Sequence, residues 1–212
     1  VTHVTVYFLI ACTGSPGPTM FTFRKPTRET IDTLRDQCHD VPFNYPAVGS
    51  SQVAGSTPPS GYSQDQIKIE LGRGQATFER ARIAIQQWEM FPPSMVELFW
   101  PTVPITQGSV VAVLFRGYGF WSLNPARIVY TFDETGQIDR CGFAYGTLPG
   151  HLATGEERFC VSWDHATDCV HYQIDVFSRP NHWFVWLGYP LARLEQARFR
   201  KLSARAMKDF VG

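Results

Sequence analysis

The feature of the sequence that most limits its fold is a long run of strand-like segments followed by one amphipathic helix. Between turns rich in Gly, Pro, Asn and Asp, the segments that read as strands are 96–100, 110–117, 126–133, 141–147, 156–163 and 169–178. Short connections between consecutive strands predict an antiparallel sheet. Residues 190–211 then return to a helical period, with an apolar stripe at Leu191, Leu194, Leu202, Ala206 and Phe210. Because this helix has a single apolar face, we expect it to pack against the sheet.

A short helix and an irregular lead-in are expected near the start of the chain. Residues 27–40 place Ile31 and Leu34 at helical spacing, with Thr27 as the N-cap, and predict a short surface helix. Residues 41–62 are rich in Pro, Gly and Ser, so they predict an extended segment. We interpret this segment as a plain connector, and a mobile lid over a pocket is the alternative.

A strand and an amphipathic helix follow the lead-in. Residues 66–71 alternate apolar and polar side chains, as a half-buried strand does. Residues 75–90 form a helical pattern that ends before Pro92, and its apolar face is made of Phe78, Ala81, Ile85 and Trp88. The order of elements predicts an α+β fold, a curved antiparallel β-sheet wrapped around the long C-terminal helix, with an N-terminal helical and loop segment. A closed antiparallel barrel with peripheral helices is the alternative.

The composition is that of a folded chain without a strong charge bias. Of the 212 residues, 19 are basic and 19 are acidic, so the formal net charge is zero, which argues against a dedicated nucleic-acid binder. An aromatic content of 14% argues against disorder. No run approaches the roughly 18 uninterrupted apolar residues that a membrane-spanning helix needs. We therefore expect a soluble globular protein.

The spacing of cysteines and histidines favours neither a metal site nor a disulfide framework. The five cysteines are scattered and never form CxxC, and the six histidines include no HExxH pair. A scattered, odd-numbered set of cysteines suits a reducing compartment. The expected location is therefore cytoplasmic, with no metal and no cofactor.

The first nineteen residues differ from the rest of the chain. Residues 4–12 are apolar, residues 13–18 are rich in turn formers, and Met20 opens a segment with ordinary polar patterning. A secretory signal is one interpretation, but no Lys or Arg precedes the apolar run. We therefore expect residues 1–19 to be an N-terminal extension and residues 20–212 to form a single α+β domain.

Several phrases of the sequence together resemble one family. They are FTFRKP near Met20, FNYPAVG, GYSQDQIKIELGRGQATFERA, WEMFPPSMVEL, GFWSLNPARIVY, GFAYGTLPGHLATGEERFCVSWD and FSRPNHWFVWLGYPLARLEQARF. On these phrases the chain resembles the DUF1990 (UPF0548) family, a domain of unknown function, from about Met20 to the C-terminus. The resemblance supplies no reaction. Separately, the order of elements is similar to the helix-grip arrangement of START-like and Bet v 1-like proteins, in which sheet and helix enclose a cavity.

Glu157 is the main candidate for chemistry. Side chains alternate along a strand, so one face of the segment 156–163 carries Glu157, Phe159, Val161 and Trp163, and the other carries Glu156, Arg158, Cys160 and Ser162. If the first face lines a cavity, Glu157 lies in an apolar wall that favours its neutral form, and it would suit a general acid or base. The simpler alternative is a glutamate at the end of a strand paired with an arginine.

The remaining candidates are aromatic, basic and histidine side chains near the expected cavity. His151, in a loop flanked by Gly and Pro, is the second candidate for proton transfer, and an ordinary loop histidine is the alternative. The expected ligand-binding residues are Tyr130, Tyr145, Glu157, Phe159, Trp163, Tyr172, Arg179 and Arg198. The expected cavity wall also includes Phe143, Val161, Ile174, Leu194 and Leu202. Core packing and local ion pairs explain these residues nearly as well.

Three functions remain open from the sequence. The first is binding of a small apolar or amphipathic molecule between the sheet and the C-terminal helix. The second is an enzyme that uses Glu157 or His151 for acid–base chemistry in that cavity. The third is a partner-binding or membrane-peripheral protein that acts through an outer helix surface carrying Arg193, Arg200, Lys201, Arg205 and Lys208. A membrane surface is not favoured, because the helix is committed to the core.

Overall fold

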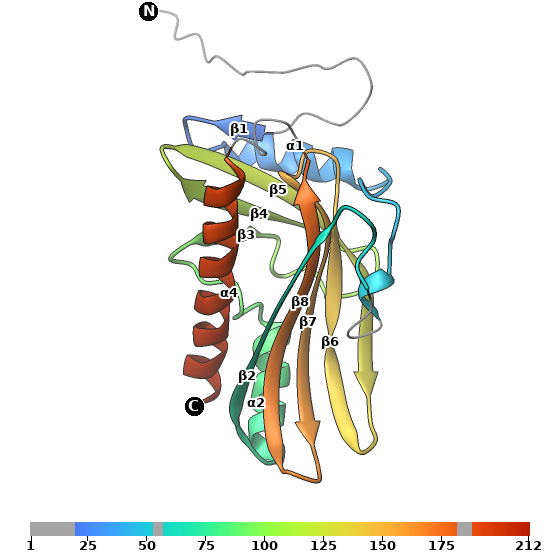
Figure 1. Cartoon of the computed structure of the whole chain (residues 1–212). Helices are drawn as coiled ribbons and strands as arrows, with labels where there is room; N and C mark the ends of the chain where they lie inside the picture. Colours follow the sequence, from blue (N-terminus) through green and yellow to red (C-terminus); the bar gives the residue numbers. More distant parts are fainter. Residues whose placement is uncertain (1–19, 53–56, 182–187) are drawn as a thin grey trace, which may run out of the picture.

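The fold is a single antiparallel sheet gripping a long terminal helix (Figure 1). The computed structural model describes residues 20–52, 57–181 and 188–212, so the expected extension 1–19 lies outside the described residues. The elements are β1 (Met20–Thr22), α1 (Arg28–Cys38), the 3₁₀ turn η1 (Ser50–Gln52), β2 (Ser63–Arg73), α2 (Gln75–Gln86), β3 (Val96–Phe99), β4 (Val110–Gly117), β5 (Phe120–Glu134), β6 (Ile138–Thr147), β7 (Ala153–Asp164), β8 (Cys169–Pro180) and α4 (Tyr189–Val211).

The second strand of the chain, β2, pairs with the last strand, β8, and lies at one edge of the sheet. Seven strands follow the order β2-β8-β7-β6-β5-β4-β3, and every neighbouring pair is antiparallel. The short strand β1, which the sequence analysis did not predict, pairs with the first residues of β5. With α4 running along the sheet, this confirms the expected curved antiparallel sheet and helix-grip arrangement (Figure 1).

The inner face of the sheet, defined as the face that carries α2 and α4, holds the main core. The predicted apolar side of α2 is confirmed, since Phe78, Ala81 and Ile85 are all buried in this core. The helix ends at Gln86, four residues earlier than predicted, because Trp88 adopts a positive φ of 61° and turns the chain inward. Its indole then packs against the Phe143 ring at 5.0 Å between centroids.

The buried face of α4 differs from the predicted stripe. Ser203, Ala204, Met207 and Val211 are the buried positions, whereas Leu191, Leu194 and Phe210 are 40%, 66% and 38% exposed. The prediction was wrong because it followed the larger side chains Leu191, Leu194 and Phe210, whereas the buried face lies one residue further around the helix. Small residues at this face allow close packing, and the Ser203 hydroxyl hydrogen bonds to the Tyr172 hydroxyl at 2.8 Å. Within the described ranges no helix is long and apolar enough to cross a membrane.

The outer face of the sheet, opposite α2 and α4, is covered by the N-terminal segment. Helix α1 begins after Thr27, whose hydroxyl accepts the backbone N–H of Thr30 at 3.2 Å, so the predicted N-cap is confirmed. Ile31 and Leu34 of α1 pack on the outward side chains of β4 and β5. At and just after the end of α1, the backbone carbonyls of Cys38 and Val41 accept hydrogen bonds from the Arg127 side chain at 2.5 and 2.8 Å. These contacts attach the lead-in to the sheet.

A buried carboxylate on β7 anchors the rest of the lead-in. Glu156 is 1% exposed, and its oxygens accept the Tyr45 hydroxyl at 2.7 Å and the Gly49 backbone N–H at 2.5 Å. They also accept the backbone N–H and the hydroxyl of Ser51, at 3.1 and 2.5 Å. A buried carboxylate is tolerated when donors of this kind surround it. The segment around η1 therefore depends on one side chain of the sheet.

We expect Glu156→Ala to lower the free energy of unfolding by about 3 kcal/mol, because it leaves the buried Tyr45 hydroxyl and the Gly49 and Ser51 backbone N–H groups without an acceptor. Urea denaturation measures the loss, and hydrogen exchange at the Gly49 and Ser51 amides should accelerate. Glu134→Ala is the matched control, since that carboxylate is 60% exposed and 3.9 Å from Arg140. Equal losses in the two variants would contradict the anchoring role.

Candidate functional site

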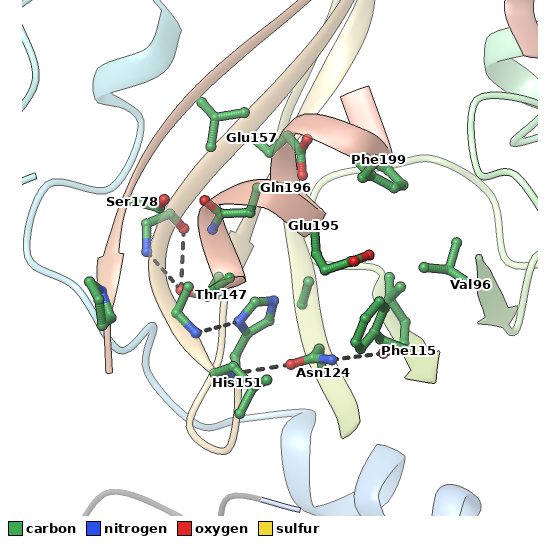
Figure 2. Close-up of a pocket in the computed structure, with 18 of the residues that line it drawn as sticks. Val96, Phe115, Asn124, Thr147, His151, Glu157, Ser178, Glu195, Gln196 and Phe199 are labelled. Carbon is green, nitrogen blue, oxygen red and sulfur yellow. Dashed lines mark hydrogen bonds between the residues drawn. The ribbon is translucent and has the colours of Figure 1, made fainter. Parts of the chain in front are cut away.

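A pocket of about 430 Å³ lies between the N-terminal half of α4 and the inner face of the sheet (Figure 2). We call it the α4 pocket. Strands β3 to β8, the loop 148–152 and the turn after α2 complete its walls, and no residue of α2 itself lines it. Its apolar walls include Phe91, Val96, Val113, Phe115, Val176 and Phe199. The pocket is therefore mainly apolar, with polar side chains at a few defined positions.

Glu157 of β7 and Tyr145 of β6 form a hydrogen-bonded pair in the wall of the pocket. The two residues are register partners on adjacent strands, and the Tyr145 hydroxyl donates to Glu157 Oε2. Burial raises the pKa of the Glu157 carboxyl to about 7, although the Tyr145 hydrogen bond and the positive charge of Arg200 oppose the shift. This carboxyl can therefore exchange a proton near neutral pH.

The alternation predicted for β7 is confirmed. Phe159 and Val161 are fully buried in the inner core on the same side as Glu157. On the other side, Arg158 pairs with Asp175 at 3.1 Å and lies over the Phe132 ring at 4.6 Å. Glu157 itself lies in no ion pair within 4 Å among the described residues.

An arginine pair on α4 ties the helix to the edge strand β2 beside the pocket. Arg193 and Arg200, one heptad apart, both bind the Asp65 carboxylate, with Arg200 at 3.2 Å and the Arg193 Nη2 at 2.6 Å. Burial raises the pKa of Asp65, but the hydrogen bond from Arg193 and the charge of Arg200 outweigh it and hold this pKa below its ordinary value. Because one carboxylate serves two guanidinium groups, the cluster keeps a net positive charge next to Glu157.

The other rim of the pocket carries Glu195. Its Oε1 accepts a hydrogen bond at 2.8 Å from the hydroxyl of Tyr118, which lies in the turn between β4 and β5. Its Oε2 lies 3.5 Å from Arg198. Arg198 is 62% exposed and does not line the pocket. Tyr118 is 56% exposed and does line it, so this contact bridges the helix and the hairpin at the solvent side.

His151 lines the pocket from the loop between β6 and β7, and its ring faces the space between Phe115 and Glu195 (Figure 2). Burial lowers the pKa of the imidazole to about 4, so the ring is neutral at physiological pH. A proton carrier works best with a pKa near the operating pH, so this environment favours a hydrogen-bonding role over proton transfer.

Of the residues singled out from the sequence, the structure brings Tyr145, His151, Glu157 and Arg179 to the pocket. The Arg179 guanidinium lies over the Tyr62 ring at 4.7 Å, and its Nε donates to Thr154 Oγ1 at 3.3 Å. Binding and catalytic roles for these residues stay predictions.

The other expected ligand contacts lie elsewhere. Phe159 and Tyr172 are fully buried in the inner core, where Phe91 packs on Phe159 at 5.7 Å. Trp163 stacks near Phe78 at 6.0 Å. Tyr130 is on the outer face, where its hydroxyl bonds the Ser51 hydroxyl at 2.7 Å. The open space is thus closer to the start of α4 than expected, because side chains of α2 and its following turn fill the middle of the inner face.

The sequence analysis missed the Asp65 cluster and placed two of its arginines on an outer basic surface. Arg200 is only 12% exposed and Arg193 30%, and Arg205 is 3.6 Å from Asp209. The heptad spacing of Arg193 and Arg200 was the available signal, since it puts both on one side of a helix. Nothing in the sequence paired them with a strand 128 residues away.

Comparison with known proteins identifies relatives over most of the chain. A family model described as "Domain of unknown function (DUF1990)" matches residues 44–206. A UPF0548 protein of Dictyostelium discoideum is 35% identical over 209 residues, which cover 91% of this chain and 96% of that one. A UPF0548 protein of Deinococcus radiodurans is 33% identical over 203 residues, which cover 91% of this chain and all of that one.

Similar solved structures have low sequence identity. Ara h 8.0201 gives a TM-score of 0.42 at 11% identity, and the match covers 71% of this chain and 98% of that one. Human STARD10 gives a TM-score of 0.40 at 10% identity, covering 87% of this chain and 80% of that one. The family model and the two relatives, by contrast, match at the level of sequence over most of the chain. On these matches the chain belongs to the DUF1990 family of UPF0548 proteins.

Proposed function

We propose that the protein binds a small apolar or amphipathic molecule in the α4 pocket. The observation that carries this proposal is the contrast within one face of the sheet. Phe143, Phe159 and Tyr172 are 0% exposed in a filled core, whereas the α4 pocket keeps about 430 Å³ open beside them. Ligand sites are typically mostly apolar hollows of several hundred Å³ with few polar groups.

The distribution of polar groups supports an amphipathic occupant. Phe91, Phe115 and Phe199 offer aromatic contact for an apolar body. Glu157 with Tyr145 supplies one hydrogen-bonding position, and His151 supplies another in a different wall (Figure 2). A ligand with an apolar skeleton and one or two polar groups matches this arrangement.

Filling the pocket should abolish binding. We expect the apolar dye N-phenyl-1-naphthylamine to bind the wild-type protein and Ala192→Trp to weaken its binding at least about tenfold, because the indole occupies the space beside α4. Ala197→Trp is the matched control, since it adds the same side chain to the same helix away from the lining. Dye fluorescence titration gives both dissociation constants. Equal binding by the two variants would contradict the proposed site.

A second experiment looks for the natural ligand in the purified protein. Native mass spectrometry of the purified protein, followed by solvent extraction and mass analysis, should recover an apolar or amphipathic molecule from the wild-type protein. The Ala192→Trp variant, purified in parallel, should carry less of it than Ala197→Trp. This pair of variants separates occupancy of the pocket from adhesion to other surfaces.

A second candidate function, acid–base catalysis on a bound molecule, is favoured by one observation. Glu157 is the carboxyl of the pocket whose pKa burial raises to about 7, and Tyr145 donates a hydrogen bond to it. A catalytic acid or base works best with a pKa near the operating pH. The two functions share one pocket, and turnover of the extracted ligand, lost in Glu157→Gln, distinguishes catalysis from binding.

The pKa of Glu157 predicts a pH-dependent stability. The ordinary value of 4.5 applies in the unfolded chain, so the folded protein holds an extra proton between about pH 4.5 and pH 7. Stability contributed by the protonated carboxyl is therefore full below pH 4.5 and lost as the pH rises through 7. Relative to Glu157→Gln, we expect the wild-type free energy of unfolding to fall by about 2 kcal/mol over this range, after discounting for partial exposure.

Urea denaturation at half-unit steps from pH 4.5 to pH 8 measures this difference. Tyr145→Phe serves as the comparison variant, because it removes the hydrogen bond that lowers the pKa of Glu157. In that variant the fall should extend to higher pH. Parallel curves for the wild type and Glu157→Gln at every pH would contradict a raised pKa.

A further inference from the structure

The backbone around His151 is fixed by hydrogen bonds on both sides. The His151 N–H donates to the Leu148 carbonyl at 3.1 Å, and the Asn181 side-chain amide donates to the His151 carbonyl at 2.9 Å. The next residue, Leu152, donates its N–H to Asn124 Oδ1 at 3.2 Å. The ring therefore has a set position in the wall of the α4 pocket, as sites that recognise ligands require.

The same loop fixes the tautomer of the ring. The Ala153 backbone N–H donates to His151 Nδ1 at 3.0 Å, so Nδ1 carries a lone pair and no proton. A neutral imidazole has one N–H, which must then be on Nε2. Burial lowers the pKa of the ring to about 4, which keeps it in this neutral form. His151 thus presents one N–H group in one defined direction.

This N–H group has no acceptor among the described residues, whereas nearby polar groups of the lining are already bonded. The Asn124 amide donates to the Val113 and Ser122 carbonyls at 3.2 and 3.0 Å. The Thr147 hydroxyl donates to Asn44 Oδ1 at 2.5 Å and accepts the Gly155 N–H at 2.9 Å. Figure 2 shows the His151 ring projecting into the pocket beside Asn124. An unbonded donor in an apolar wall favours a ligand that brings an acceptor.

We propose that His151 Nε2 is the ligand-orienting donor of the α4 pocket, and that the pocket takes neutral amphipathic molecules carrying a carbonyl-type acceptor oxygen. The inference rests on the proposed function and names its ligand class. A neutral imidazole does not offset the desolvation of a carboxylate, and both lining guanidinium groups are already engaged, Arg200 with Asp65 and Arg179 with Thr154. A cationic amine has no acceptor to offer the N–H. A neutral oxygen meets neither objection.

Two matched dyes test the inference. The first is 6-propionyl-2-(dimethylamino)naphthalene, whose emission shifts to the red when its carbonyl accepts a hydrogen bond, and the second is the same dye with a methylene in place of the carbonyl. We expect His151→Phe to weaken the binding of the carbonyl dye about fivefold and to shift the emission of the bound dye to the blue. The affinity for the methylene dye should change less than about twofold. His151→Gln, whose Nε2 can replace the imidazole N–H, should restore much of the loss.

The outcomes separate this inference from the proposed function. Equal losses for both dyes in His151→Phe, or unchanged binding of the carbonyl dye, would overturn the donor role while leaving the pocket a binding site. If neither dye binds the wild-type protein, the proposed function fails as well.

The tautomer of His151 can be tested on the wild-type protein without any ligand. In two-bond ¹H–¹⁵N correlation spectra, the His151 ring should show a protonated Nε2 and a bare Nδ1, unchanged from pH 8 to pH 5.5. This result would support the donor role even if a substituted loop failed to fold. A ring that titrates near its ordinary pKa of 6.5, or that carries its proton on Nδ1, would overturn it.

Discussion

The alternation of side chains along β7 is the constraint on which the two sides of this molecule depend. Glu156 and Glu157 are adjacent, so a strand must send their carboxylates to opposite faces of the sheet. The Glu156 carboxylate is buried on the outer face of the sheet, and hydrogen bonds from Tyr45, Gly49 and Ser51 stabilise it there. Glu157 enters the pocket with a single donor from Tyr145. A shift of register by one residue would exchange the anchor and the pocket carboxyl.

The pocket exists because the two helices of the inner face cover it unequally. The C-terminal half of α4 lies beside α2, where Ala204 and Met207 are buried and Arg80 of α2 donates to the Val211 carbonyl at 2.8 Å. Among the elements that the structure describes, no second helix lies beneath the N-terminal half of α4 (Figure 1). That half is held by Asp65 instead, through arginine side chains long enough to bridge from helix to strand. The C-terminal half of α4 is therefore packed on α2, whereas the N-terminal half is held from the side by β2, and the pocket lies under that N-terminal half.

Local patterns in the sequence were sufficient for strands β2 to β8, the α1 cap and the alternation along β7, but not for the short strand β1. They were insufficient for α4, because its buried face includes a serine bonded to Tyr172 and excludes leucines at 191 and 194. Apolar counting cannot distinguish a leucine at a pocket rim from one in a core. The predicted position of the open space was wrong for a related reason. Phe159 and Tyr172 look the same in the sequence whether a cavity or Trp88 and Phe91 lie opposite them.

The sequence likewise identified some residues of the candidate site and missed others. Glu157 and His151 were identifiable because each is a polar group in an apolar or loop context, which is a local signal. Asp65 was not, because its role depends on Arg193 and Arg200, which are far away in sequence and adjacent only after β2 pairs with β8. Its charge compensation is a property of the folded topology alone.

The two polar positions of the pocket respond differently to pH because of these surroundings. His151 stays neutral down to about pH 4, whereas Glu157 loses its proton near pH 7. Arg200 only partly favours the ionised carboxylate, since its guanidinium is already bonded to Asp65. The Glu157 carboxyl therefore changes the charge of the pocket near neutral pH, and the His151 N–H keeps its direction while that charge changes. An amphipathic ligand would meet a constant donor at one wall and a pH-dependent partner at the other.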